Sequence, residues 1–438
     1  MHWRRRNHRG SKTLTALLLM ILFLASCHQA QGIDERLSVV VKPYRFSVMR
    51  WELSELLRRP ARLPGDAASQ SATRAAVSVV DKYMTLQTEI RRVEAEIGRQ
   101  PRGESGPETP GQLQTLQERK RVLASEVERI LGGQIRQMLQ NEGIHNPADR
   151  LVRLGVAFPP LYFRLQKPPH TLIVSPRERI ESMREETLLQ ELSPDAVDEI
   201  EVKVEALGVS ALVEEIGGFG ATFPTFVSDD ASLNWIVKTA TEEWLHQYLA
   251  FTPLGFAYVL DVTGIKRNYD IATMNETVVG MVSAEIASRV MQTYYPEYLQ
   301  PRTTERPVEP QIDFDSTMRE IRLKVDDMLA KGQVDQAEQF MQERRQYLQA
   351  HGYYIRRLNQ AYFAFYGTYA DMPGSVSPIG EELRQLQSRS RSLREFLNAA
   401  AGMHRRGDVQ ELLKGLVISQ ADTGLPAVRS PVVVGTRP

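Results

Sequence analysis

The sequence predicts an α+β protein that is predominantly helical and carries a helical hairpin near its N-terminus. Apolar residues recur at helical spacing along most of the 438 residues, whereas short apolar runs bounded by Gly or Pro, which favour strands, cluster between residues 150 and 230. Hydrophobic residues make up 42% of the chain and charged residues 25%, which is typical of a globular protein and excludes a disordered or collagen-like chain. The length favours about two to three domains.

The first 27 residues have the pattern of an export signal. A basic segment precedes an apolar run from Leu14 to Leu24, which is short for a spanning helix. The run ends in Leu24-Ala25-Ser26-Cys27, which resembles the lipobox of bacterial lipoproteins, where the signal is removed and the new N-terminal Cys is lipidated. We therefore expect a lipid anchor on Cys27 that tethers the chain to the extracytoplasmic face of the cell membrane. An uncleaved single hydrophobic anchor is the alternative.

Charge and cysteine content exclude further classes of protein. Lys+Arg and Asp+Glu both number 54, and removal of the signal takes away five basic residues, which leaves a net charge of −5. A mildly acidic chain is not expected to bind nucleic acid. A single cysteine excludes disulfides and thiolate metal clusters within one chain, while eight histidines allow a His/carboxylate metal site.

Residues 37–148 are predicted to form a helical region, with residues 37–41 as a strand or an extended lead-in and a first helix over 46–59. Heptad spacing then predicts a hairpin over residues 72–140, whose two helices are separated by a linker rich in Pro and Gly at 101–110. We favour a structural arm packed on the body, and a partner-binding or spacing stalk is the alternative.

Residues 150–295 have the pattern of a small sheet with helices. The expected strands and helices are strands at 158–163, 170–174, 209–216 and 221–227, a helix opened by Ser175-Pro176, a helix over 194–207 capped by Ser193 and ended at Gly208, and two longer helices over 231–251 and 270–293. The strand around residues 220–226 contains Pro224, which favours a sheet edge to which an extended peptide could add. A Pro-rich link at 296–312, a C-terminal helical domain over 313–418 and a disordered tail over 419–438 follow.

The helix over 231–251 contains Glu242-Glu243-Trp244-Leu245-His246, which has the spacing of a metal-binding motif. Zinc hydrolases use His-Glu-x-x-His, in which ligands at i and i+4 lie one turn apart on one helix face. Here Glu242 takes the first position, and a carboxylate can bind zinc at about 2.0–2.2 Å. Glu243 would take a proton from a water whose pKa the metal lowers to about 7. Glu242 makes the site more anionic than two imidazoles would, which permits Zn²⁺ or another divalent metal.

The next expected helix contains Asn275-Glu276, 30 residues after His246. This order of strand, Glu-Glu-x-x-His helix and Asn-Glu helix resembles the gluzincin metallopeptidases over about residues 155–415. More narrowly, the helix and the Phe251-Thr-Pro-Leu-Gly255 segment after it are similar to poorly characterised bacterial surface proteins with a His-Glu-Trp-x-His-x-Tyr-Leu helix. The resemblance implies a gluzincin-like core, with Glu243 as general base and with His246 and Glu276 as metal ligands. Glu242 departs from the family pattern.

A gluzincin-like site also needs a donor for the oxyanion that forms during hydrolysis, often a Tyr or His from the C-terminal part. Tyr369 is our first candidate and Tyr366 the second. The alternative is that both tyrosines are packing aromatics whose hydroxyls are satisfied elsewhere.

The sequence therefore predicts a membrane-tethered extracytoplasmic hydrolase that resembles a metallopeptidase, with a peptide as substrate. The alternative is a catalytically inactive pseudoenzyme that acts as a surface scaffold or as a partner-binding lipoprotein, which the Glu at position 242 favours.

Overall fold

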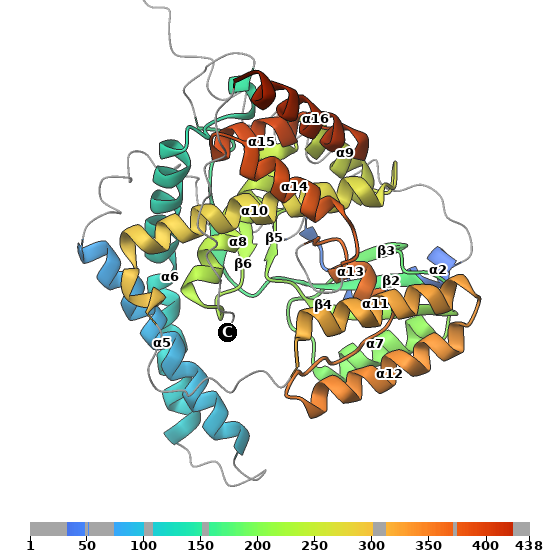
Figure 1. The fold of residues 1–438 in the computed structure, drawn as a ribbon. Coiled ribbons are helices and arrows are strands. Elements are labelled where there is room, and N and C mark those ends of the chain that lie inside the picture. Colours follow the sequence, from blue (N-terminus) through green and yellow to red (C-terminus); the bar gives the residue numbers. More distant parts are fainter. Residues whose placement is uncertain are drawn as a thin grey trace, which may run out of the picture.

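A computed structural model gives the fold of the chain (Figure 1). It describes residues 33–48, 51, 74–99, 108–150, 157–300, 312–370 and 375–423. The protein is mostly helical, with 65% helix, 9% strand and small sheets, in agreement with a predominantly helical α+β protein. In the described ranges no helix combines the length and the apolar character needed to cross a bilayer. The signal segment with Cys27, most of the helix predicted over 46–59 and residues 424–438 lie outside the described residues.

The predicted N-terminal hairpin is confirmed by helices α5 (Arg74–Arg99) and α6 (Glu108–Asn141), which pack against each other along their length. Ile90 and Val93 of α5 meet Leu116 near the start of α6, while residues early in α5 pack near the end of α6, as an antiparallel pair requires. The hairpin projects from the body in Figure 1. The Gln87 side chain donates a hydrogen bond to the Ala231 carbonyl at 2.8 Å, which ties the arm to the body.

The first hydrophobic core joins the base of this hairpin to a bundle of helices and a small sheet. The sheet has the order β1-β6-β5, with β1 parallel and β5 antiparallel to β6. Helix α10 crosses the centre of this part and is apolar on most sides, as expected for a helix surrounded by others (Figure 1). The elements around the first core, besides the hairpin, are β1 (Phe163–Leu165), β5 (Gly218–Phe219), β6 (Thr225–Val227), α8 (Leu233–Leu249), α9 (Pro253–Val262), α10 (Tyr269–Tyr294), the short 3-10 helix η3 (Pro296–Leu299), α14 (Ile379–Arg389), α15 (Leu393–Ala401) and α16 (Arg406–Thr423).

A second core forms around an antiparallel sheet of order β3-β2-β4. Alternate residues of the central strand face opposite sides: Leu172 packs with α2 and α7, while Ile173 packs with Ala361 of α13. Burial on both faces explains why every residue of that strand is buried. The parts are β2 (His170–Pro176), β3 (Arg184–Leu188), β4 (Val209–Glu215), α2 (Ile33–Val41), α7 (Pro194–Glu205) and, on the other face of the sheet, α13 (Gln360–Tyr366). Helices α11 (Phe314–Ala330) and α12 (Val334–Ala350) pack with Phe363 of α13 in a third hydrophobic cluster. The segment 313–418 thus contributes to this third cluster and to the first core.

Two predictions were wrong in their bounds: the strand expected at 158–163 is β1 at Phe163–Leu165, and residues 419–423 of the expected disordered tail belong to α16. Three others were wrong in kind or place. Residues 37–41 form the end of α2 because Leu37 and Val41, four apart, pack as one helix face into the second core. Ser175-Pro176 does not open a helix: both residues pair with β4 as the end of β2. The predicted strand over 220–226 is not the sheet edge, because β6 lies between the two edge strands β1 and β5.

Other local predictions were confirmed. The Ser193 hydroxyl accepts a hydrogen bond from the Ala196 N–H at 3.2 Å and so caps α7. Gly208 adopts a φ of +86°, a left-handed conformation that glycine tolerates after a helix end. Helices α8 and α10 match the ranges expected over 231–251 and 270–293.

Candidate metal centre

Helix α8 carries two of the predicted metal ligands. The Ser232 hydroxyl accepts a hydrogen bond from the Trp235 N–H and sets the start of the helix. Glu242 and His246 are separated by four residues and therefore lie on one face of α8. The helix is amphipathic around them, because Trp244 and Leu245 point into the first core.

Helix α10 brings the third predicted ligand to the same place. The Asn268 side chain caps the start of α10, and α10 packs along α8. Glu242, His246 and Glu276 each offer a ligand atom within 4.8 Å of the other two. The His246 Nε2 and Glu276 Oε2 atoms are 3.7 Å apart. Two ligands that bind one tetrahedral ion at about 2.1 Å are separated by about 3.4 Å, so a small adjustment would suffice to share a cation.

The orientation of His246 is set by a residue that the sequence analysis did not assign. The Oδ1 atom of Asn275 lies 2.9 Å from Nδ1 of His246. An amide oxygen can only accept a hydrogen bond, so this contact favours the tautomer in which Nδ1–H donates to Asn275 and the lone pair of Nε2 is directed toward Glu276. Metal-binding histidines are commonly fixed by such a hydrogen bond on their other nitrogen.

Tyr258 of α9 is a second residue that sequence reasoning missed. Its hydroxyl donates a hydrogen bond to Glu276 Oε1 at 2.5 Å, and its ring stacks on His246 with 5.5 Å between the ring centroids. Desolvation raises the pKa of the Glu276 carboxyl, while His246 and the Tyr258 hydroxyl oppose that rise. The second oxygen of Glu276 is therefore left for another partner.

Glu243, the predicted general base, is on α8, and its carboxyl group lies against the edge strand β5. A Cβ atom added to Gly218 or Gly220 would overlap its carboxyl oxygens, so both glycines are needed for the room it occupies. Desolvation raises the pKa of Glu243 well above its ordinary value, and the charges of Glu242 and Glu276 raise it further, against a hydrogen bond from the Gly220 backbone. Glu243 thus has the high proton affinity of a base in a cluster of carboxylates.

Glu242 is shared with a competing cation. Nζ of Lys238, one turn earlier on α8, lies 3.5 Å from Oε2 of Glu242. The side chains of Glu242, His246 and Glu276 are 15%, 19% and 9% exposed, so the cluster is largely shielded from solvent. An ion bound there would compete with Lys238 for the Glu242 carboxylate.

The two candidate tyrosines lie in different places. Tyr369, which follows α13, is close enough to the cluster that the charge of Glu276, followed by desolvation and the other glutamates, raises its pKa well above the ordinary value. The Tyr366 hydroxyl instead donates a hydrogen bond to Glu214 of β4 at 2.8 Å. The structure therefore brings Tyr369 to the candidate site and holds the Tyr366 hydroxyl at a different carboxylate.

Comparisons with models of protein families, with curated proteins and with solved structures found no match to this chain.

Proposed function

We propose that this protein is a metal-dependent hydrolase, similar to a metallopeptidase, that is tethered to the extracytoplasmic face of a membrane. The observation that carries the proposal is the meeting of Glu242, His246 and Glu276, from two packed helices, around one point. The base Glu243 stands beside that point. The tether is inferred from the signal segment and Cys27 in the sequence.

The donor set suits a divalent cation. Imidazole and carboxylate ligands bind zinc, and a set with two carboxylates also accommodates harder ions such as manganese. A cation would offset the mutual repulsion of three neighbouring glutamates, which is the cause that follows desolvation in raising the pKa of Glu243. When bound, the metal would polarise the scissile carbonyl and increase the acidity of water.

The residues of the chain would then transfer the proton, stabilise the oxyanion and bind the substrate. Glu243 takes a proton from the attacking water and delivers it to the nitrogen of the leaving amine. Tyr369 remains protonated and donates a hydrogen bond to the carbonyl oxygen as negative charge develops there. The free edge of β5, whose Gly218 borders Glu243, offers backbone groups to an extended peptide.

The first test combines metal analysis with a single substitution. Gently purified protein should contain one divalent ion per chain, which His246→Ala should lose. Glu243→Gln should lower peptide hydrolysis by about 100-fold or more while metal content and melting temperature stay nearly unchanged. Metal affinity should fall as the pH is lowered, because desolvation raises the pKa of Glu276, whose carboxyl must lose its proton to bind a cation. Undiminished hydrolysis in Glu243→Gln would contradict the mechanism.

An inert surface scaffold is the second candidate function. The ion pair between Lys238 and Glu242 favours it, because the lysine already supplies a positive charge where the family pattern has a metal-binding His. Absence of a stoichiometric ion in the native protein, together with a sharp gain in metal affinity on Glu242→His, would support the scaffold and identify the site as a degraded one.

A further inference from the structure

A cavity of about 560 Å³, partly open to solvent, lies between α7 and β4 of the second core, α12 and the segment that leads into α13. None of the residues of the candidate metal centre lines it. Four arginines surround the cavity, which is an unusual concentration of positive charge for one small space: Arg177, Arg345, Arg356 and Arg357. Its volume is within the usual range of small-molecule sites, about 300–1,000 Å³.

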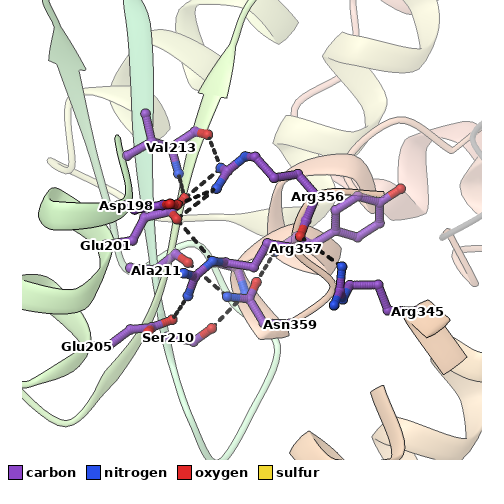
Figure 2. A network of polar contacts seen from close by, with 12 residues as sticks. Asp198, Glu201, Glu205, Ser210, Ala211, Val213, Arg345, Arg356, Arg357 and Asn359 are labelled. Atoms are coloured by element: carbon purple, nitrogen blue, oxygen red, sulfur yellow. Dashed lines mark hydrogen bonds and ion pairs between the residues drawn. The ribbon is translucent and has the colours of Figure 1, made fainter. Parts of the chain in front are cut away.

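Three of these arginines are neutralised by carboxylates. Figure 2 shows Arg356 and Arg357 converging on Glu201, with Arg357 also bonded to Glu205. Arg177 pairs with Glu338 at 2.6 Å, and the hydrogen bonds to that carboxylate raise the pKa of its guanidinium. These three side chains are therefore structural and hold the walls of the cavity.

Arg345 differs from the other three. Its Nε donates to the Gln342 side chain at 3.1 Å and one Nη donates to the Arg356 carbonyl at 3.5 Å, both neutral acceptors. Among the described residues no carboxylate lies within ion-pair distance of its guanidinium. Figure 2 shows Arg345 apart from the Glu201 network, on the other side of Asn359. A positive charge in the wall of the cavity is thus left without a counter-charge.

Ser210 of β4 supplies a second unused donor in the same cavity. The side chain is only 4% exposed, and its oxygen accepts a hydrogen bond from the Ala361 N–H at 3.3 Å. In the part of the chain that the structure describes, its hydroxyl proton has no acceptor. A buried hydroxyl without an acceptor is unfavourable, and a bound acceptor in the cavity would satisfy it.

We propose that this cavity binds a small molecule that carries an oxyanion, either a carboxylate or a phosphate. Arg345 supplies the charge and Ser210 a neutral hydrogen bond, and the paired arginines keep the pocket in shape. This inference is independent of the metal centre, so the binding site can exist whether or not the protein is a hydrolase.

The test is calorimetric titration of the purified full-length chain with inorganic phosphate and, separately, with acetate, at constant ionic strength. At least one anion should bind saturably, and the one that binds more tightly identifies the class of ligand. Arg345→Ala should weaken binding about tenfold or more, Arg345→Lys should retain most of it, and Ser210→Ala should weaken it less than Arg345→Ala does.

Arg344→Ala is the matched control, because Arg344 precedes Arg345 on α12 but lies over the rings of Phe340 and Tyr347, outside the cavity. Equal unfolding midpoints for the variants would exclude a folding defect. The proposal is overturned if neither anion binds saturably, or if Arg344→Ala weakens binding as much as Arg345→Ala.

Discussion

Asn275, Tyr258 and Lys238 each hold one side chain of the metal centre, but they affect a cation differently. Asn275 bonds the nitrogen of His246 that faces away from Glu276, and Tyr258 occupies one oxygen of Glu276 while the other remains free. Both contacts orient a ligand without competing for it. Lys238 attracts the carboxylate of Glu242 itself, so a metal ion must displace it.

Lys238→Met should therefore tighten metal binding several-fold, because the Glu242 carboxylate loses its competing partner and the apolar chain length is nearly preserved. The measurement is a competitive metal titration against a chromogenic chelator. Lys324→Met on α11 is the control for net charge, since that lysine is half-exposed and 4.0 Å from Asp327. Unchanged or weaker binding in Lys238→Met would mean that the lysine does not limit access to Glu242.

At the residue scale, the sequence was sufficient to identify candidate ligands whose proximity follows from helix geometry. Glu242 and His246 were found by their spacing of four, and Glu276 by its place in the following helix. Tyr258 could not be found, because α9 is apolar on several sides and has no clear period. The role of Asn275 depends on how α8 and α10 pack, which no local pattern encodes.

At the scale of elements, the two-residue strand β5 sets the position of Glu243, the proposed general base. Gly218→Ala should push the Glu243 carboxyl out of place and lower hydrolysis by about 100-fold, as a displacement of about 1 Å can do. Gly280→Ala makes the same chemical change in α10, where nothing lies within 4 Å of the added methyl group. It should leave activity unchanged and stabilise the protein by about 0.5–1 kcal/mol.

Peptide hydrolysis and thermal unfolding, measured on both glycine variants, check this prediction. Equal losses of activity in Gly218→Ala and Gly280→Ala would show that the space beside Glu243 is not the cause.

Elements with a complete local signal were predicted correctly, and elements decided by their neighbours were not. α7 has a Ser cap, a Pro at its first position and a closing Gly, and its bounds were close to those observed. The segment Ser175-Pro176 has the same opening signal, but pairing with β4 outweighs it. Likewise, the apolar run at 37–41 is compatible with a strand or a helix. It is helical, as part of α2, because that conformation lets it pack against α7 and the sheet.

At the scale of the whole molecule, Glu201 joins elements that are distant in sequence. Its side chain is fully buried on α7, where it accepts hydrogen bonds from the Val213 backbone and from Arg356 and forms an ion pair with Arg357, both arginines lying ahead of α13 (Figure 2). The network therefore connects α7, β4 and the C-terminal half of the chain.

Glu201→Leu should destabilise the protein by about 3 kcal/mol, because it removes the fully buried carboxylate that two partly buried guanidinium groups share and leaves them only the more exposed Glu205 and Asp198. Glu205→Leu removes a half-buried carboxylate bonded to Arg357 alone and should cost less than about 1 kcal/mol. Urea unfolding followed by circular dichroism gives both values. Similar free energies of unfolding for the two variants would show that the buried network does not hold these elements together.

Tyr369 belongs to a segment that leaves the second core, while the side chains it faces are mounted on helices of the first. Two hydrogen bonds connect this segment to α10: the Tyr269 hydroxyl donates to the Gly367 carbonyl at 2.8 Å, and the Ala370 N–H donates to the Thr277 hydroxyl at 3.4 Å. A hinge movement between the two cores would strain these two hydrogen bonds first. How closely the Tyr369 hydroxyl approaches the glutamate cluster therefore depends on these contacts between the two cores, rather than on the rigidity of either core.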